Sequence, residues 1–206
     1  MPALICAPMG SDVTSAGAFV DFDITVCGVA ELAGHGTTGI THVLSILDPG
    51  SPAPAAFDSF GKHERLDLRF HDIIDDLPGM QLPQPEHIAA LLRFGRRLMR
   101  VPKAHLLVHC QMGISRSSAS MALILAQARP DRPAAEALVE TRRIRQRIWP
   151  NLRVIELGDA QLGRGGRLVA AAVARYRHVL ERRPEMALAM QQLGRGREIE
   201  AARGAA

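Results

Sequence analysis

The sequence predicts an α/β domain in which about four to five mainly parallel strands form a central sheet with helices on both faces. Two observations favour this fold class. Short runs rich in β-branched and apolar residues alternate with longer segments whose apolar residues recur at helical spacing. The segments between them are rich in Gly, Pro and Asp, which favour turns. The content of 47% hydrophobic and 22% charged residues is ordinary for a globular domain.

Four segments are expected to be strands. Ile24–Val29 and Thr41–Leu47 are short, apolar or β-branched, and bounded by Gly, Pro or Asp. Leu66–Phe70 alternates apolar and polar residues, and the stretch from there to Pro85 is rich in Asp, Pro and Gly, as loops are. Leu106–Val108 is an uninterrupted apolar run, which is typical of a buried central strand.

Helices are expected mainly in the second half of the chain. Pro85 suits the first position of a helix, and Arg116–Ala128 is apolar nearly all round, as in a buried helix. The expected helices are Pro85–Met99, Arg116–Ala128, Pro133–Arg147, Leu152–Leu162 and a longer one that includes Leu168 and Leu180. We expect one domain over residues 1–190. Residues 191–206, rich in Ala, Arg and Glu, are expected to fray.

The composition argues against several classes of protein. Three cysteines without a CxxC pair do not predict a disulfide framework or a zinc site. Residues 1–10 lack the basic start and apolar stretch of a signal peptide, and no apolar run reaches the length of a membrane span. The net charge of +4 favours anionic substrates, but no nucleic-acid-binding signature is present. We expect a cytoplasmic protein without membrane or nucleic-acid partners.

The segment that carries chemistry is HCQMGISRSS, residues 109–118. Cys110 ends the expected central strand, five residues follow, and Arg116 opens the buried helix. A Cys and an Arg at this spacing can occur by chance, and neither Cys6 nor Cys27 has an Arg at the same distance. The strand before, the glycine within and the helix after make the pattern specific.

This segment predicts a phosphate cradle. A loop of this length can turn its backbone N–H groups toward one tetrahedral anion, and the following helix N-terminus adds positive potential. The expected phosphate-binding residues are Gln111, Met112, Gly113, Ile114, Ser115 and Arg116. Gly113 permits positive φ, and the planar guanidinium of Arg116 can grip two phosphate oxygens. The same donors stabilise the thiolate of Cys110, which makes it a nucleophile rather than only a buried core cysteine.

Two neighbours have alternative interpretations. His109 either orients the loop by hydrogen bonds or fills the end of the strand. Ser117 either donates a hydrogen bond to the cysteine sulfur or serves only the first turn of the helix.

The segment resembles the signature His-Cys-x-x-Gly-x-x-Arg-Ser/Thr of the protein tyrosine phosphatases, and its Ser-Arg-Ser ending is similar to the dual-specificity branch. Phe70–Ile73, Pro150–Asn151 and Leu162–Arg167 extend the resemblance to bacterial tyrosine phosphatases over roughly residues 41–172. It implies a protein-tyrosine-phosphatase-like fold and hydrolysis of phosphomonoesters through a phosphocysteine intermediate, with no metal or other cofactor. It also implies that Asn151 supports the phosphate loop, and a helix N-cap role for Asn151 is compatible with this.

Three carboxylates, Asp72, Asp75 and Asp76, are candidates for the general acid. The Phe-His-Asp placement of Asp72 resembles the layout of dual-specificity phosphatases, 38 residues before Cys110. It also puts Asp72 at the carboxyl end of a strand, where the phosphate loop should emerge. Asp75 and Asp76 lie deeper in the loop and would reach the site only if the loop folds over it. We therefore predict Asp72 as the acid.

The expected partner is a phosphorylated protein, carrying phosphotyrosine or phosphoserine/threonine, or another phosphomonoester. One alternative is a protein that binds phosphate without turnover. Another is a phosphatase that acts on a phosphoinositide, a nucleotide or an RNA 5′-phosphate. The arginines at 142–147 could bind the negative charge of such a substrate, although an exposed basic helix face also explains these arginines. A sulfurtransferase also uses a loop cysteine, but Arg116 and Ser117 fit phosphate better.

Overall fold

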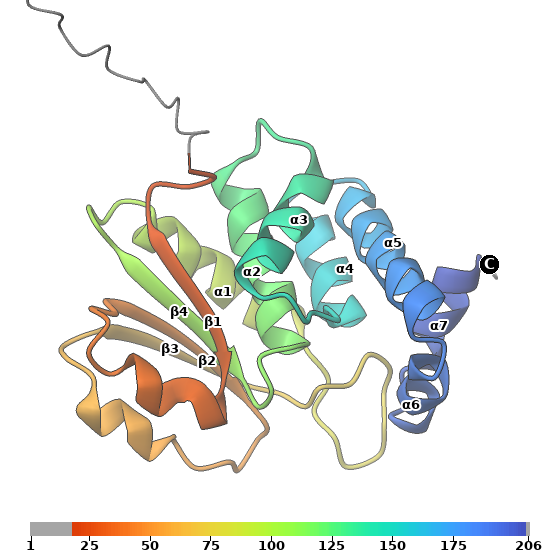
Figure 1. Ribbon diagram of the computed structural model, residues 1–206, viewed down its shortest axis with the longest axis horizontal. Helices are drawn as coiled ribbons and strands as arrows, with labels where there is room; N and C mark the ends of the chain where they lie inside the picture. The colour runs from red at the N-terminus through yellow and green to blue at the C-terminus, as the bar shows by residue number, and fades with distance from the viewer. Residues whose placement is uncertain (1–17, 205–206) are drawn as a thin grey trace, which may run out of the picture.

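A sheet of four parallel strands lies at the centre of the molecule (Figure 1), in the order β1-β4-β2-β3. The computed structural model describes residues 18–204, so the expectations for Cys6 and residues 1–10 lie outside the described residues. The strands are β1 (Asp23–Gly28), β2 (His42–Leu47), β3 (Glu64–Arg69) and β4 (His105–Cys110). Because β4 lies between β1 and β2, the chain that leaves it at Cys110 emerges near the middle of the carboxyl edge. The prediction of a parallel sheet is confirmed.

The burial of the strands follows their sequence. β2 is buried along its whole length and β4 at all residues after His105, as expected for strands covered on both faces. β3 lies at an edge and alternates leucines with charged residues, and Arg65 donates a hydrogen bond to Asp67 at 2.9 Å. Charged side chains on an edge strand discourage pairing with another chain.

The two faces of the sheet are covered by different kinds of helix (Figure 1). One face packs against the α helices α1 (Pro85–Leu98), α2 (Arg116–Ala128) and α3 (Ala134–Ile144). The helices α4 (Leu152–Gln161) and α5 (Arg167–Arg182) pack in turn on this layer. In the described part of the chain, the opposite face is covered by two 3-10 helices, η1 (Val29–His35) and η2 (Ala55–Ser59), packed over Val43 and Leu107. Helices on both faces were expected, but these short ones lack the 3.6-residue periodicity by which helices are recognised.

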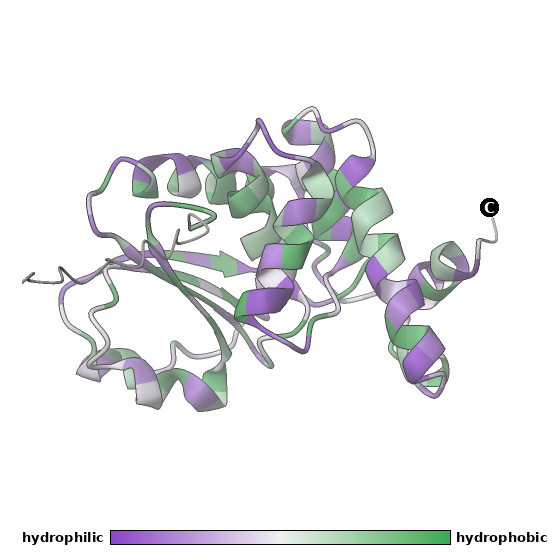
Figure 2. Cartoon of the chain, turned by 45° about the horizontal axis from the view of Figure 1, so that its top comes forward, coloured by the Kyte–Doolittle hydropathy of each residue, from purple (hydrophilic) through white to green (hydrophobic). Residues whose placement is uncertain are grey.

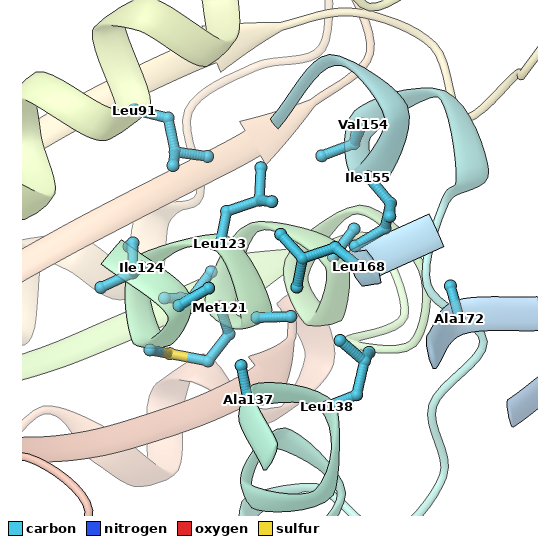
Figure 3. Packing of buried hydrophobic residues seen from close by; sticks show 14 of the residues in the cluster. Leu91, Met121, Leu123, Ile124, Ala137, Leu138, Val154, Ile155, Leu168 and Ala172 are labelled. Carbon is cyan, nitrogen blue, oxygen red and sulfur yellow. The ribbon is translucent and has the colours of Figure 1, made fainter. Parts of the chain in front are cut away.

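The main core is centred on α2, whose first eleven residues are all buried. Figure 3 shows Leu123 and Ile124 of this helix among side chains from α1, α3, α4 and α5, namely Leu91, Ala137, Leu138, Val154, Ile155, Leu168 and Ala172. Hydrophobic residues are accordingly concentrated in the strands and in the helices against them (Figure 2). No helix in residues 18–204 has the length and apolar content needed to cross a membrane.

Two expectations about the second half need correction. The helix expected over Pro133–Arg147 ends at Ile144, because Arg145 has extended backbone angles (φ −128°, ψ 103°). The expectation that residues 191–206 fray is wrong for residues 191–203, which complete α6 (Met186–Gln192) and form α7 (Gly196–Arg203). The apolar anchor of α7 is small, mainly Ile199 and Ala202, and the sequence does not show that the charged Arg195 and Glu198 are also buried.

Candidate active site

The loop between β4 and α2 is packed directly against the end of β1. Gly28 is the register partner of Cys110, and the N–H of Val29 donates to the carbonyl oxygen of Gln111 at 3.1 Å. Gly113 has φ +69°, and a Cβ atom there would lie 2.5 Å from the carbonyl carbon of Cys27. Only glycine fits this position, since both the backbone angle and the space exclude a side chain.

The other loop residues differ in exposure. The side chains of Gln111 and Met112 are exposed, so only their backbones can belong to the cradle. Ile114 is half-buried, and its carbonyl oxygen accepts hydrogen bonds from the N–H of Trp149 at 3.0 Å and from the hydroxyl of Ser118 at 2.5 Å. The loop is thereby fixed at both ends.

Cys110 lies at the bottom of this loop, where its side chain is nearly inaccessible. Its Sγ atom is 3.2 Å from Oγ of Ser117, which is in the first turn of α2 and is fully buried. A hydroxyl at this distance can donate a hydrogen bond to a cysteine thiolate. The predicted contact between Ser117 and the sulfur is therefore present.

Arg116 is anchored by one end of its guanidinium group. Its Nη1 donates to Oδ1 of Asp48 at 2.6 Å and to the carbonyl oxygen of Phe70 at 2.7 Å. The side chain is 3% exposed, and its buried Nε has no hydrogen-bond partner among residues 18–204. A buried donor without a partner is costly, so this edge of the guanidinium is suited to an oxyanion held in the loop. Asp48 directly follows β2, and nothing in its local sequence distinguishes it from an ordinary loop residue.

Asp72 is joined to the loop and to the support behind it. Its Oδ1 accepts hydrogen bonds from Ser115 Oγ at 2.7 Å and from Asn151 Nδ2 at 2.8 Å. Asn151 is fully buried, and its Oδ1 caps α4 by accepting from the N–H of Val154. The helix cap expected of Asn151 is present, and its side-chain amide binds Asp72 rather than the phosphate loop itself.

The cradle therefore joins a buried thiol, a fixed guanidinium and a carboxylate at the carboxyl edge of a parallel sheet. No family model matches the sequence, and a search of the curated proteins finds no match. Among solved structures, Tk-PTP in its active form has a TM-score of 0.50 at 22% identity, over 70% of this chain and 92% of that chain. Human DUSP28 has a TM-score of 0.52 at 15% identity, over 69% and 95%.

The chain has the fold of the protein tyrosine phosphatases. At these identities the likeness concerns the fold alone. Roles for individual residues of this phosphatase-like chain therefore rest on its own geometry.

The three acidic candidates lie in different surroundings within this phosphatase-like fold. Asp72 contacts the phosphate loop, as described above. Asp75 instead accepts a hydrogen bond at 2.9 Å from Arg197 of α7, which also pairs with Glu156 of α4. Asp75 and Asp76 both line a shallow cavity with Glu156 and Arg197. Within residues 18–204, Asp72 is the one of the three whose carboxylate contacts the loop that follows Cys110.

The carboxyl-terminal segment supplies a support that the sequence analysis missed. Arg195, 4% exposed, donates to Ser115 Oγ at 2.8 Å and lies 3.5 Å from Asp72 Oδ1. Its other terminal nitrogen pairs with the fully buried Glu198 at 2.6 Å. Glu198 also accepts from the indole N–H of Trp149 and from the N–H of Leu152. The segment expected to fray thus holds the loop and the candidate acid from behind.

A second support was also missed, on the opposite side of the loop. Arg145 makes a two-pronged ion pair with Glu31 of η1, with N–O distances of 2.8 Å, and also donates to the carbonyl oxygen of Met112 at 3.3 Å. The N–H of Gly28 donates to Glu31 at 2.6 Å. The early end of α3 at Ile144 makes this contact possible, because Arg145 leaves the helical path.

His109 is buried and packs against Phe57, in the smaller hydrophobic cluster between the sheet and the two 3-10 helices. Its ring lies 5.5 Å from that of Phe57, and burial lowers the pKa of His109 to about 4. No hydrogen bond to either ring nitrogen is found within the described chain. Its surroundings match the packing role considered for it, at the end of the strand that carries Cys110.

Proposed function

We propose that the protein hydrolyses phosphomonoesters, with Cys110 as the nucleophile. The observation that carries the proposal is the presence of two buried groups at the two ends of the loop between β4 and α2. The Cys110 sulfur faces a hydroxyl donor at 3.2 Å, and the anchored Arg116 keeps a buried Nε without a partner in the described residues. A thiolate with a guanidinium poised for an oxyanion is the arrangement needed for attack on a phosphate group.

In the first step the Cys110 thiolate attacks phosphorus, so that an S–P bond forms as the ester P–O bond breaks. The leaving oxygen takes a proton from the carboxylic acid of Asp72. In the second step a water gives a proton to the Asp72 carboxylate and its oxygen attacks phosphorus, and the S–P bond breaks to return the thiolate and inorganic phosphate. The loop N–H groups and Arg116 stabilise the charge on the equatorial oxygens throughout, and Ser117 stabilises the departing thiolate. These steps need no metal or other cofactor.

The assignment of Asp72 as the acid rests on position. Ser115 and Asn151 bind one carboxylate oxygen and so fix the side chain beside the loop, and the side chain is 31% exposed. The second oxygen can thus face a bound ester. Asp75, which is bound by Arg197, and Asp76 would serve only if their loop folded over the site.

For the substrate, we propose a phosphorylated protein carrying phosphotyrosine or phosphoserine/threonine, and a cytoplasmic setting in which the thiol stays reduced. The only tyrosine, Tyr176, is fully buried and its hydroxyl donates to the carbonyl of Pro150. It therefore offers no wall for a deep phosphotyrosine pocket, which supports dual specificity. Phosphoinositides, nucleotides and RNA 5′-phosphates are the alternative substrates.

The proposal is tested by release of inorganic phosphate from a small aryl phosphate in the presence of a metal chelator. We expect multiple turnovers by the wild-type protein. Binding of the ester without phosphate release would overturn the proposal in favour of a binding protein without turnover. Phosphopeptide, phosphoinositide and nucleotide panels, compared by kcat/KM, then rank the substrate classes.

A further inference from the structure

A groove of about 480 Å³ adjoins the phosphate loop. Its lining residues come mainly from the end of α3 and the segment after it, and from the carboxyl-terminal half of α5 and the segment after that. Ile114 of the phosphate loop is one of its lining residues. Ile114 is four residues from Cys110, so their Cα atoms are at most about 14 Å apart even along an extended chain. The groove therefore begins within about 14 Å of Cys110, a distance that about four residues of an extended substrate chain can span.

The polar lining of the groove is entirely cationic or neutral. Among the described residues, the lining includes no carboxylate and five arginines, namely Arg142, Arg147, Arg175, Arg182 and Arg183. Only Arg183 forms an ion pair, with Glu185. The other four form no ion pair or side-chain hydrogen bond with any residue that the structure describes. The buried Nε of Arg175 is among the donors without a partner.

Arginines just outside the groove are paired, which makes the contrast informative. Arg143 binds Glu140 at 2.7 Å, and Arg145 binds Glu31. The cluster at residues 142–147 is therefore divided: its paired members stabilise the fold, whereas Arg142 and Arg147 line the groove. The potential in the groove is positive, since Arg182 is the main cause that lowers the pKa of the lining residue His178, ahead of burial and Arg175.

The floor of the groove is apolar. Ile114, Val179 and Met186 are half-buried there, above the buried Ile148 and Trp149. A polyphosphate would leave this apolar surface in water. A single-stranded nucleic acid would need accessible aromatic faces for its bases, but Trp149 is 2% exposed and stacks on the buried Tyr176. A ligand that fits both the arginines and the apolar floor carries carboxylates interleaved with apolar side chains.

We propose that this groove binds an acidic, apolar-containing segment of the protein substrate beside its phosphorylated residue, an inference that rests on the proposed function. The carboxylates pair with the unpaired arginines, and an apolar side chain covers Ile114, Val179 and Met186. The groove thus selects protein substrates with acidic flanks, while the phosphate loop performs the reaction.

The test uses two phosphopeptides that differ only by Asp/Glu against Asn/Gln in their flanks. The readout is the ratio of kcat/KM for the acidic over the neutral peptide, so that effects on the chemistry cancel. We expect a wild-type ratio of about ten at low salt, falling toward one as ionic strength rises. Arg175→Gln with Arg182→Gln should bring the ratio near one, whereas Arg143→Gln, whose side chain is exposed and paired with Glu140, should keep it. A wild-type ratio near one, or an unchanged ratio in the double variant, would overturn the proposal.

A direct binding measurement separates this inference from the proposed function. Fluorescence anisotropy of a labelled, unphosphorylated acidic peptide needs no turnover, and the double variant should bind it about fivefold to tenfold more weakly than the wild type. If the aryl phosphate is not hydrolysed but this difference in affinity remains, peptide binding in the groove is supported and the proposed enzymatic activity is refuted. Equal binding by both proteins would contradict the proposed peptide site in the groove and would leave the proposed hydrolysis unaffected. Displacement of the peptide by a short polyphosphate or an oligonucleotide at lower concentration than by unlabelled peptide would contradict the proposed occupant.

Discussion

Replacing Arg195 by methionine removes the cation that joins the carboxyl-terminal segment to the phosphate loop. Arg195 is 4% exposed, Glu198 is fully buried, and their N–O distance is 2.6 Å. Removing one partner of a buried pair costs about 3–5 kcal/mol, because the other charge stays buried. Two donors to Glu198 remain, from Trp149 and Leu152, so we expect a loss at the lower end, about 3 kcal/mol.

The loss should depend on pH in one direction. Burial raises the pKa of Glu198 above its ordinary value of 4.5 even with Arg195 present, and loss of Arg195 raises it further. A carboxyl group whose pKa rises on folding stabilises the folded state fully below its ordinary pKa, and this contribution is lost as pH rises through the raised pKa. The Arg195→Met variant should therefore be least destabilised, relative to the wild type, near pH 4.5 and most destabilised at higher pH.

Urea unfolding of four proteins measures this effect: the wild type, Arg195→Met, Glu198→Gln and the double variant. We expect the double variant to recover most of the stability lost in Arg195→Met, because no buried charge is left alone. Its kcat/KM for an aryl phosphate should be as low as that of Arg195→Met, since in both proteins Ser115 has lost a hydrogen-bond donor and Asp72 a neighbouring cation. An Arg195→Met variant within about 0.5 kcal/mol of the wild type, or a double variant as unstable as the single one, would refute the reasoning.

Three further predictions concern the loop and its strand. Arg116→Lys should lower kcat several hundred-fold, which corresponds to a loss of about 3–4 kcal/mol in transition-state stabilisation. The reason is that a point charge cannot keep the hydrogen bonds to Asp48 and Phe70 and also bind the phosphate. A kcat within threefold of the wild type would contradict this. Asp72→Asn should slow the hydrolysis of esters with poor leaving groups much more than that of activated esters, and should flatten the alkaline limb of the pH–rate profile. Asp48→Asn should slow the hydrolysis of both kinds of ester alike; the reverse pattern would make Asp48 the acid. Because burial lowers the pKa of His109 from 6.5 to about 4, its contribution to stability is present above pH 6.5 and lost as pH falls toward 4. The wild type should therefore lose about 3 kcal/mol more than His109→Leu between pH 7 and pH 4, and equal losses contradict the burial of a neutral ring.

Local patterns were sufficient to predict the elements that position the site. The apolar run before Cys110, the glycine at 113 and the apolar helix after Arg116 each determine their own conformation, so β4, the loop and α2 follow from neighbouring residues. The prediction of Arg116–Ala128 as a buried helix agrees with the structure at both ends.

The contacts that the sequence could not show are long-range pairs of charged residues. Asp48 and Arg116 are 68 residues apart, Glu31 and Arg145 are 114 apart, and each looks like an ordinary surface residue in its local sequence. Arg195 and Glu198 are close in sequence, but only the folded chain brings them against Ser115 and Trp149. Burial of charge contradicts the usual interpretation of an Arg- and Glu-rich tail, which is why the expectation of fraying was wrong.

The central claim is that Cys110 carries the phosphoryl group. The most direct measurement is a rapid denaturing quench of the wild type and Cys110→Ser during aryl phosphate hydrolysis, followed by mass spectrometry of the peptide that contains residue 110. We expect a phosphoryl group on Cys110 of the wild type. We expect neither phosphorylation nor turnover in Cys110→Ser, which should still bind the ester through the loop and Arg116. Turnover by Cys110→Ser above background, or a phosphoryl group on a different residue of the wild type, would contradict it.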